Sequence, residues 1–299
     1  MATLNTSGLR DGYADLGEAR LHYVEAGEGP LVVLLHGFPE FWFSWRFQIP
    51  ALAAAGFRVV APDMRGYNLS SRPVGVAAYD PDRLAADVRD LIRERGADRA
   101  FLVAHDWGAG VAWLTAMNYP EVVERLAILN APHPRRLLHG LRRPRQLAKS
   151  WYMLFFQLPW LPERLVRASG WRSFRYGFEH DARPGAFTPQ DLGRYLEAWS
   201  QPGAATAMIN YYRAAFRQTP RRAEARIRPI HAPTLVIWGE RDRYLGAELA
   251  EPERADVPNL ERVVRLPDAS HWVQHDEPER VGQLLVEFFT GAAEREPAA

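Results

Sequence analysis

Short apolar stretches alternate along this chain with longer amphipathic ones. Apolar runs that predict buried strands fall at 31–35, 57–61, 100–104, 125–129, 233–238 and 261–265. Apolar residues recur at the spacing of one helix face at 81–95, about 107–118 and about 277–290. Strands that alternate with helices in this way predict an α/β fold, with an open and mostly parallel sheet covered by helices on both faces.

The strand pattern stops in the middle of the chain. Between residues 134 and 222 it gives way to proline- and tryptophan-rich segments with helical spacing. We therefore expect residues 1–133 and 223–299 to form the core and residues 134–222 to form an inserted helical cap. Such a cap would lie over the C-terminal ends of the strands, where ligands bind in open α/β sheets.

The most informative local pattern is Ala104-His105-Asp106-Trp107-Gly108, which follows an apolar strand and precedes a helix. Small residues two before and two after the central side chain are typical of a nucleophile elbow, a tight turn that exposes one side chain. Here the exposed side chain is a carboxylate, which is ionised near neutral pH and can displace a leaving group from saturated carbon to form an ester. Taken alone, Asp106 would more often be a helix N-cap.

An ester on Asp106 must be hydrolysed before a second turnover, so the chain should also supply a base that activates water. His271, in a small loop between a short strand and the last helix, is the expected base. Asp242, three residues after Gly239 at the end of another strand, is the expected acid that orients it. His275 competes with His271 for the role of base.

Two backbone N–H groups are expected to stabilise the oxyanion formed during ester hydrolysis. One belongs to Trp107, the residue after the nucleophile, and the other to Phe38 in the loop after the strand 31–35. Gly37 allows the loop to approach the nucleophile closely. His36 is expected to brace this loop and to have no catalytic role.

Several of these motifs together resemble the soluble epoxide hydrolases of the α/β-hydrolase superfamily, and the resemblance extends over nearly the whole chain. They are His36-Gly37-Phe38-Pro39, Pro62-Asp63-Met64-Arg65-Gly66-Tyr67-Asn68-Leu69-Ser70, His105-Asp106-Trp107-Gly108 and His271-Trp272. The order nucleophile, acid, histidine along the chain agrees with this superfamily. The resemblance implies an α/β-hydrolase fold, and it supports Asp242 through the neighbouring Gly239 and Arg243-Tyr244.

The resemblance also implies two tyrosines in the cap that bind the epoxide oxygen, Tyr152 and Tyr212. A phenol can donate a hydrogen bond to an ether oxygen and protonate it as it becomes an alkoxide. Tyr211 is the neighbour most easily confused with Tyr212, and either tyrosine could instead be an ordinary core aromatic. The residues expected to line the substrate pocket are Phe38, Trp107, Trp151 and Phe156.

Composition excludes some classes of function. The 299 residues include 37 basic and 36 acidic side chains, a net charge of +1, so no global field favours nucleic acid or anionic membranes. There is no cysteine, and no two of the nine histidines have a metal-binding spacing on a predicted helix. His271 and His275 are four residues apart but straddle a predicted passage from loop to helix, so we expect no metal and no cofactor. No apolar run is long enough to span a membrane and the N-terminal residues do not resemble a signal peptide, so the expected location is the cytoplasm.

The basic run at 134–145 is expected to be a solvated cap entrance, with contact to phosphate or a membrane surface as the alternative.

These features predict a cofactor-independent epoxide hydrolase whose partners are a small apolar epoxide and water. The oligomeric state is left open. One alternative is a haloalkane dehalogenase of the same fold, which also uses an aspartate nucleophile. Phe38 stands where several dehalogenases have an asparagine, and two cap tyrosines have no obvious function in binding a halide. A catalytically silent protein that binds a hydrophobic ligand is a further alternative, although no member of the catalytic set is missing.

Overall fold

A single twisted sheet forms the centre of the molecule. The computed structural model describes residues 8–217 and 219–291. Within this part of the chain the strands are β1 (Arg10–Asp15), β2 (Arg20–Ala26), β3 (Leu31–Leu35), β4 (Arg58–Pro62), β5 (Ala100–His105), β6 (Val123–Leu129), β7 (Thr234–Gly239) and β8 (Leu260–Leu266). Their order across the sheet is β1-β2-β4-β3-β5-β6-β7-β8. β2 pairs antiparallel with both of its neighbours, β1 and β4. The six strands β3 to β8 are parallel to one another.

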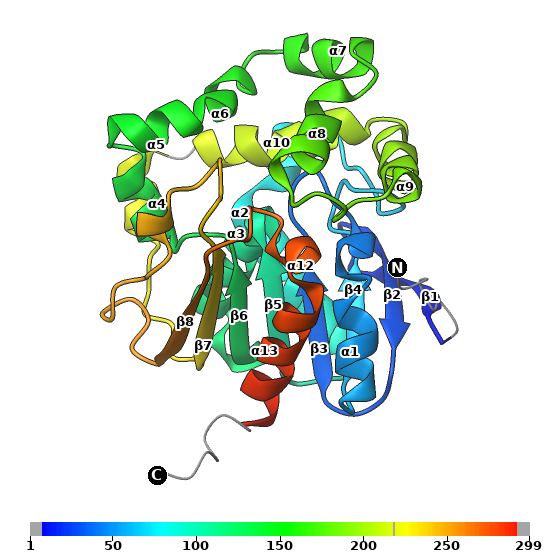
Figure 1. The fold of residues 1–299 in the computed structure, drawn as a ribbon, viewed down its shortest axis with the longest axis vertical. Helices are drawn as coiled ribbons and strands as arrows, with labels where there is room; N and C mark the ends of the chain where they lie inside the picture. Colours follow the sequence, from blue (N-terminus) through cyan, green and yellow to red (C-terminus); the bar gives the residue numbers. More distant parts are fainter. Residues whose placement is uncertain (1–7, 218, 292–299) are drawn as a thin grey trace.

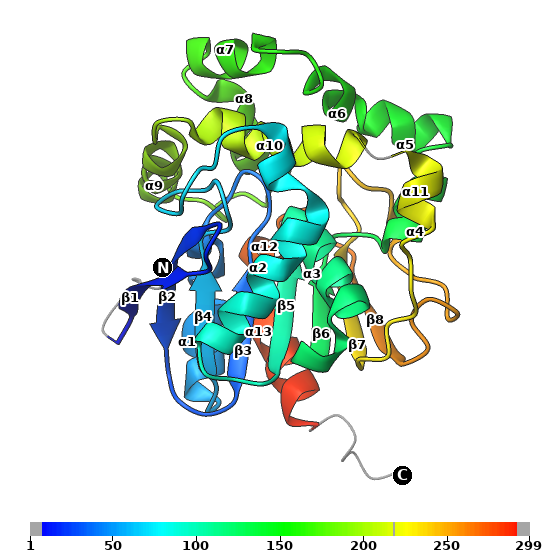
Figure 2. The ribbon, with the colours of Figure 1, turned by 180° about the vertical axis from the view of Figure 1, so that it is seen from behind.

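Helices cover both faces of this sheet, because its central strands are apolar on both sides. In β3, Val32 and Leu34 face one apolar layer, and Val33 and Leu35 face the other. The first layer is covered by α1 (Gln48–Ala54) and α13 (Pro278–Thr290), which lie in front of the sheet in Figure 1. The second is covered by α2 (Pro81–Glu94) and α3 (Asp106–Asn118), seen in front in Figure 2. The predicted α/β-hydrolase architecture is confirmed.

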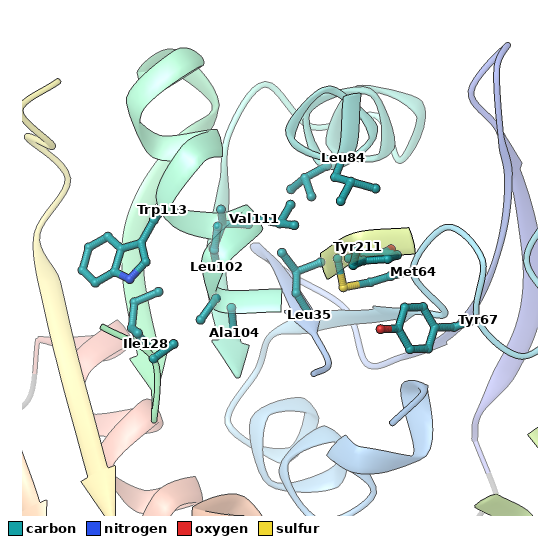
Figure 3. Packing of buried hydrophobic residues seen from close by; sticks show 14 of the residues in the cluster. Leu35, Met64, Tyr67, Leu84, Leu102, Ala104, Val111, Trp113, Ile128 and Tyr211 are labelled. Carbon is teal, nitrogen blue, oxygen red and sulfur yellow. The ribbon is translucent and has the colours of Figure 1, made fainter. Parts of the chain in front are cut away.

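The second layer fixes α3, the helix that begins at the expected nucleophile. Figure 3 shows Val111 and Trp113 of α3 beside Leu102 of β5 and Ile128 of β6. All four side chains are at most 1% exposed. Burial of such apolar side chains contributes about 25 cal/mol for each Å² removed from water. The start of α3 is therefore held rigidly at the end of β5.

The described residues between β6 and β7 form helices and no strand, and these helices lie above the C-terminal ends of the parallel strands in both views (Figures 1 and 2). They are α4 (Pro134–Gly140), α5 (Pro144–Lys149), α6 (Trp151–Phe155), α7 (Leu161–Ala168), α8 (Arg172–Tyr176), η4 (Gly177–Asp181), α9 (Pro189–Trp199), α10 (Ala204–Phe216) and α11 (Pro220–Glu224). We call α4 to α11 the helical layer. α11 runs to Glu224, two residues beyond the expected boundary at 222.

Short connecting elements complete the core. They are η1 (Trp42–Trp45), η2 (Val76–Tyr79), η3 (Pro120–Val122), η5 (Ala247–Leu249) and α12 (Val273–Asp276). No helix in the described part of the chain is long and apolar enough to cross a membrane.

Specific hydrogen bonds join the helical layer to the core. The Trp199 indole N–H donates to the Pro39 carbonyl at 2.5 Å, and the Trp272 indole N–H donates to the Gly177 carbonyl at 3.1 Å. Tyr211 of α10 donates to the Arg65 carbonyl at 2.7 Å, and its ring reaches down beside Met64 and Tyr67 in Figure 3. These bonds close the helical layer over the loops that follow the parallel strands.

Candidate active site

Asp106 occupies the turn between β5 and α3. Its φ of 48° lies in the left-handed region, while His105 before it is still extended with φ −123°. A Cβ on Gly108 would collide with the Leu35 carbonyl oxygen, and a Cβ on Gly37 would lie 2.6 Å from the Asp106 Cβ. Glycine at these two positions lets the loops close around the carboxylate, which is the geometry expected of a nucleophile elbow.

His271 lies between two carboxylates. Its Nδ1 donates to Asp242 Oδ2 at 2.7 Å, and its Nε2 is 3.5 Å from Asp106 Oδ2. Asp106 follows β5, Asp242 follows β7 and His271 follows β8. The C-terminal ends of these parallel strands lie at the same end of the sheet. The structure therefore brings together the nucleophile, acid and base expected from sequence.

His271 carries a strongly shifted pKa. Burial alone would lower it, but the charge of Asp242 and hydrogen bonds to Asp106 and Asp242 outweigh burial and raise the pKa from 6.5 to about 10. The resting imidazole is therefore protonated at neutral pH. Because part of this shift comes from Asp106, any reaction that neutralises that carboxylate lowers the pKa of His271.

Asp242 is held by several donors. The N–H groups of Tyr244 and Leu245 donate to its Oδ1 at 2.7 and 2.8 Å. Asn130, which sequence reasoning missed, donates from Nδ2 to Asp242 Oδ2 at 2.8 Å and accepts the Gly239 N–H at 2.8 Å. Burial raises the pKa of Asp242, but the His271 charge and these donors lower it overall, so Asp242 stays ionised.

The loop after β3 provides one of the two expected oxyanion donors directly. The Phe38 N–H donates to Asp106 Oδ1 at 2.8 Å. The Trp107 N–H lies in the first turn of α3, where N–H groups have no acceptor within the helix. His36 accepts the Met64 N–H at Nε2 and contacts the Gly37 carbonyl at Nδ1, both at 2.9 Å, so it braces the loop as expected.

The two tyrosines expected in the cap line a cavity together with Asp106. Tyr152 comes from α6 and Tyr212 from α10, and their ring centroids lie 5.8 Å apart. Both residues and Asp106 line the same cavity of about 440 Å³. Burial, together with the negative charge of Asp106, raises the pKa of both phenols, which therefore keep their protons at neutral pH.

The residues that competed with these assignments lie elsewhere. Tyr211 is fully buried and donates its O–H to the Arg65 carbonyl, away from the cavity. His275 contacts Glu40 at 2.8 Å on Nε2 and Arg46 at 2.8 Å on Nδ1, so it does not face Asp106. Burial and Arg46 lower the pKa of His275 to about 4. Tyr212 and His271 line the cavity that contains Asp106, whereas Tyr211 and His275 do not.

Three of the four residues expected in the pocket line the cavity: Phe38, Trp151 and Phe156. Trp107 does not, because its ring packs edge-on against Tyr212 with centroids 4.9 Å apart. The lining also contains residues that were not expected, among them Tyr244 and Asp181, whose hydroxyl and carboxylate are hydrogen-bonded at 2.7 Å. Tyr244 also packs edge-on against His271, at 5.2 Å between centroids. The cavity is mainly aromatic, with a carboxylate and an imidazole at its base.

A buried polar cluster behind Asp106 was also missed by sequence reasoning. Glu40 contacts the imidazoles of His105 and His275 at 2.8 Å and accepts the Ser44 hydroxyl at 2.6 Å. His105 in turn donates from Nε2 to the His271 carbonyl at 2.9 Å. Burial opposes ionisation of Glu40, but the imidazole of His105 holds its pKa well below the usual range. The cluster links the loop after β3, which contains Glu40, to the loop that carries His271.

The described residues contain no group of three or more histidine, aspartate or glutamate side chains placed to hold a metal ion. At the cavity the structure assembles the carboxylates of Asp106 and Asp242 with the imidazole of His271 between them. With the phenols above, this arrangement can attack an electrophilic carbon, protonate a leaving oxygen and activate water.

Comparison with known proteins agrees with this geometry. Residues 30–278 match a family model described as the alpha/beta hydrolase fold. The chain is 40% identical to an AB hydrolase superfamily protein of Bacillus subtilis over 94% of this chain and 98% of that protein. It is also 40% identical to human epoxide hydrolase 4, over 90% of this chain and 75% of the relative.

The fold comparison points to the same group. A crystal structure of a Bacillus megaterium epoxide hydrolase in complex with an inhibitor superposes with a TM-score of 0.83 at 33% identity, covering 93% of this chain and all of that one. The family model and these relatives extend over both the core and the helical layer. This chain belongs to the epoxide hydrolases of the α/β-hydrolase superfamily, and it is an enzyme of the hydrolase class.

Proposed function

We propose that this enzyme converts apolar epoxides to vicinal diols through a covalent ester of Asp106. The observation that carries the proposal is the placement of Asp106 opposite Tyr152 and Tyr212 in one aromatic cavity. In this proposal residues 134–222 act as a cap that supplies both phenols and shields the ester from bulk water. The names of the relatives support the same class of substrate.

In the first step a carboxylate oxygen of Asp106 attacks one ring carbon, and the bond from that carbon to the epoxide oxygen breaks. The phenols of Tyr152 and Tyr212 bind that oxygen, and one of them transfers its proton to the alkoxide. The negative charge thereby passes from Asp106 to a tyrosine oxygen. The products of the step are a hydroxyalkyl ester and a tyrosinate.

In the second step His271 acts as the base. Loss of the Asp106 charge removes one cause of the raised pKa of His271, so the imidazolium can give up the proton that the tyrosinate needs. The neutral imidazole, oriented by Asp242, then takes a proton from water, and hydroxide attacks the ester carbonyl. The N–H groups of Phe38 and Trp107 stabilise the oxyanion until the diol leaves and Asp106 is restored.

The test is product formation from aryl and alkyl epoxides, measured beside halide release from matched haloalkanes. Asp106→Ala is the blank, and its thermal unfolding is recorded to confirm that it folds. We expect diol from the unmodified enzyme and none from the blank. Halide without diol would replace the proposal by the dehalogenase alternative, and no product from either panel would favour a ligand-binding protein.

A further inference from the structure

The outer surface of the helical layer exposes an unusual number of large apolar side chains. Of the twelve large hydrophobic residues that are exposed in the described chain, seven lie between residues 147 and 176. Trp151 and Trp160 are 63% and 61% exposed. Exposed apolar patches of this kind mark interaction surfaces. We call the surface of α5 to α8 the outer cap face, with Leu147, Trp151, Leu154, Leu158, Trp160, Leu165 and Tyr176 as its apolar members.

The same segment is strongly basic, although the whole chain is nearly neutral. Residues 134–222 contain sixteen basic and five acidic side chains, a formal charge of +11, which leaves −10 on the rest of the chain. Several of the acidic residues are already paired within the structure, as Glu163 is with Arg213 and Asp181 with Arg243. The exposed basic residues on or beside the outer cap face are Arg142, Arg143, Arg145, Arg164, Arg167 and Arg172.

The basic run at 134–145, which was expected to be a solvated cap entrance, divides into two parts. Arg135 is ion-paired with Asp256 at 2.8 Å, and Arg136 donates to the Glu248 carbonyl at 2.6 Å, so both bind the core. The arginines from 142 onward point to solvent beside α5. Figures 1 and 2 both show α5, α6 and α7 along the side of the molecule that is farthest from the sheet.

The mouth of the active-site cavity opens on this face. Trp151 and Tyr176 are exposed members of the outer cap face and also line the cavity that contains Asp106 and His271. Lys149 lines the same cavity. A binding partner in contact with the outer cap face would therefore lie directly at the opening through which an apolar molecule reaches Asp106.

We propose that the outer cap face docks on the surface of an anionic lipid bilayer. Tryptophan and leucine side chains on short amphipathic helices insert at the headgroup boundary, and arginines bind the lipid phosphates. The positive charge complements an anionic surface and opposes face-to-face pairing of two copies of this chain. The benefit of docking rests on the proposed function, because apolar epoxides dissolved in the bilayer would enter the cavity without crossing water.

The test is co-flotation of the full-length enzyme with phosphatidylcholine vesicles, with and without phosphatidylglycerol. We expect binding to the anionic vesicles that weakens as salt is raised. Trp160→Ser/Leu165→Ser removes apolar members, and Arg167→Glu/Arg172→Glu reverses two charges, without touching residues that line the cavity. Each pair of changes should weaken binding by about tenfold or more.

Matched controls lie on the core. Tyr13→Ser on β1 and Arg93→Glu on α2 remove an exposed aromatic residue and reverse an exposed charge away from the outer cap face, and they should bind like the unmodified enzyme. Equal binding by the outer-face variants, or no binding to anionic vesicles at low salt, would overturn the proposal. Self-association that the same variants abolish, without vesicle binding, would assign the face to a second copy or another acidic protein instead.

Membrane docking and the proposed function fail independently. Flotation needs no turnover, whereas hydrolysis of a water-soluble epoxide in vesicle-free buffer needs no membrane. The outer-face variants should keep that hydrolysis rate unchanged. If the unmodified enzyme floats but yields no diol, the proposed function fails and docking stands. If it yields diol but does not float, only the docking proposal is lost.

Discussion

Asn130 gives the sharpest test of how the acid and base are positioned. Its side chain is fully buried, donates to the Asp242 carboxylate at 2.8 Å and accepts the Gly239 N–H at 2.8 Å. Removing it takes a donor from a buried carboxylate, which costs about 1.5–3 kcal/mol, and leaves the Gly239 N–H unsatisfied, which costs about 1–3 kcal/mol. We expect a total loss of stability of about 2.5–6 kcal/mol.

Two substitutions separate the lost hydrogen bonds from backbone strain. Asn130 has a φ of 42°, a conformation that glycine adopts freely and alanine does not. Asn130→Gly should lose only the hydrogen bonds, and Asn130→Ala should be about 1 kcal/mol less stable again. Chemical denaturation of the two variants and the unmodified enzyme measures both differences.

The catalytic effect should fall on ester hydrolysis. With one donor gone, Asp242 holds His271 less firmly, whereas the attack by Asp106 does not require the base. If about 1.4–2.8 kcal/mol of transition-state stabilisation is lost, the hydrolytic step slows by about 10–100-fold. Rapid-quench mass spectrometry should then show more ester at steady state. An Asn130→Gly variant with unchanged stability and unchanged ester level would refute this reasoning.

Three further predictions concern the phenols, the imidazole and the buried cluster. Tyr152→Phe and Tyr212→Phe should each slow ester formation by about 10²-fold, measured by stopped flow, while Tyr211→Phe should change stability but not that rate. The raised pKa of His271 stabilises the folded state fully below pH 6.5, and this contribution is lost as pH rises through about 10. The difference in the free energy of unfolding between the unmodified enzyme and His271→Ala should therefore shrink between pH 6.5 and about 10, as measured by chemical denaturation. Glu40→Ala leaves two buried imidazoles without their carboxylate and should cost about 3–5 kcal/mol in the free energy of unfolding; an unchanged denaturation midpoint would contradict that role.

Sequence patterns predicted the six parallel strands of the sheet well, because strands buried on both faces read as continuous apolar runs. β1 and β2 were missed. β1 is mostly exposed and its sequence, Arg-Asp-Gly-Tyr-Ala-Asp, has no apolar run. β2 contains a buried histidine and glutamate, His22 and Glu25, that interrupt its pattern. β1 forms an antiparallel hairpin with β2, and β2 pairs antiparallel with the distant β4. Periodicity along the chain does not reveal either pairing.

The site was predictable where a motif marks a strand end, and not where an ordinary polar residue supports it. Asp106 and His271 stand in recognisable loops. Asn130 and Glu40 are single polar residues with many possible roles, and only the position of Asn130 just after β6 hinted at a contact with the end of β7. Trp107 follows the nucleophile in sequence, yet the helix turns its ring toward Tyr212 and out of the cavity lining. Side-chain direction at a helix start was therefore beyond what the motif could predict.

The central claim is that Asp106 becomes an ester that only a working His271 removes. The most direct measurement is the intact mass of His271→Ala after incubation with an epoxide that the unmodified enzyme hydrolyses, followed by peptide mapping. We predict an increase equal to the mass of the epoxide, located on the peptide that contains Asp106 and absent from the double variant Asp106→Ala/His271→Ala. An unmodified mass under these conditions, or an adduct on another residue, would contradict the account.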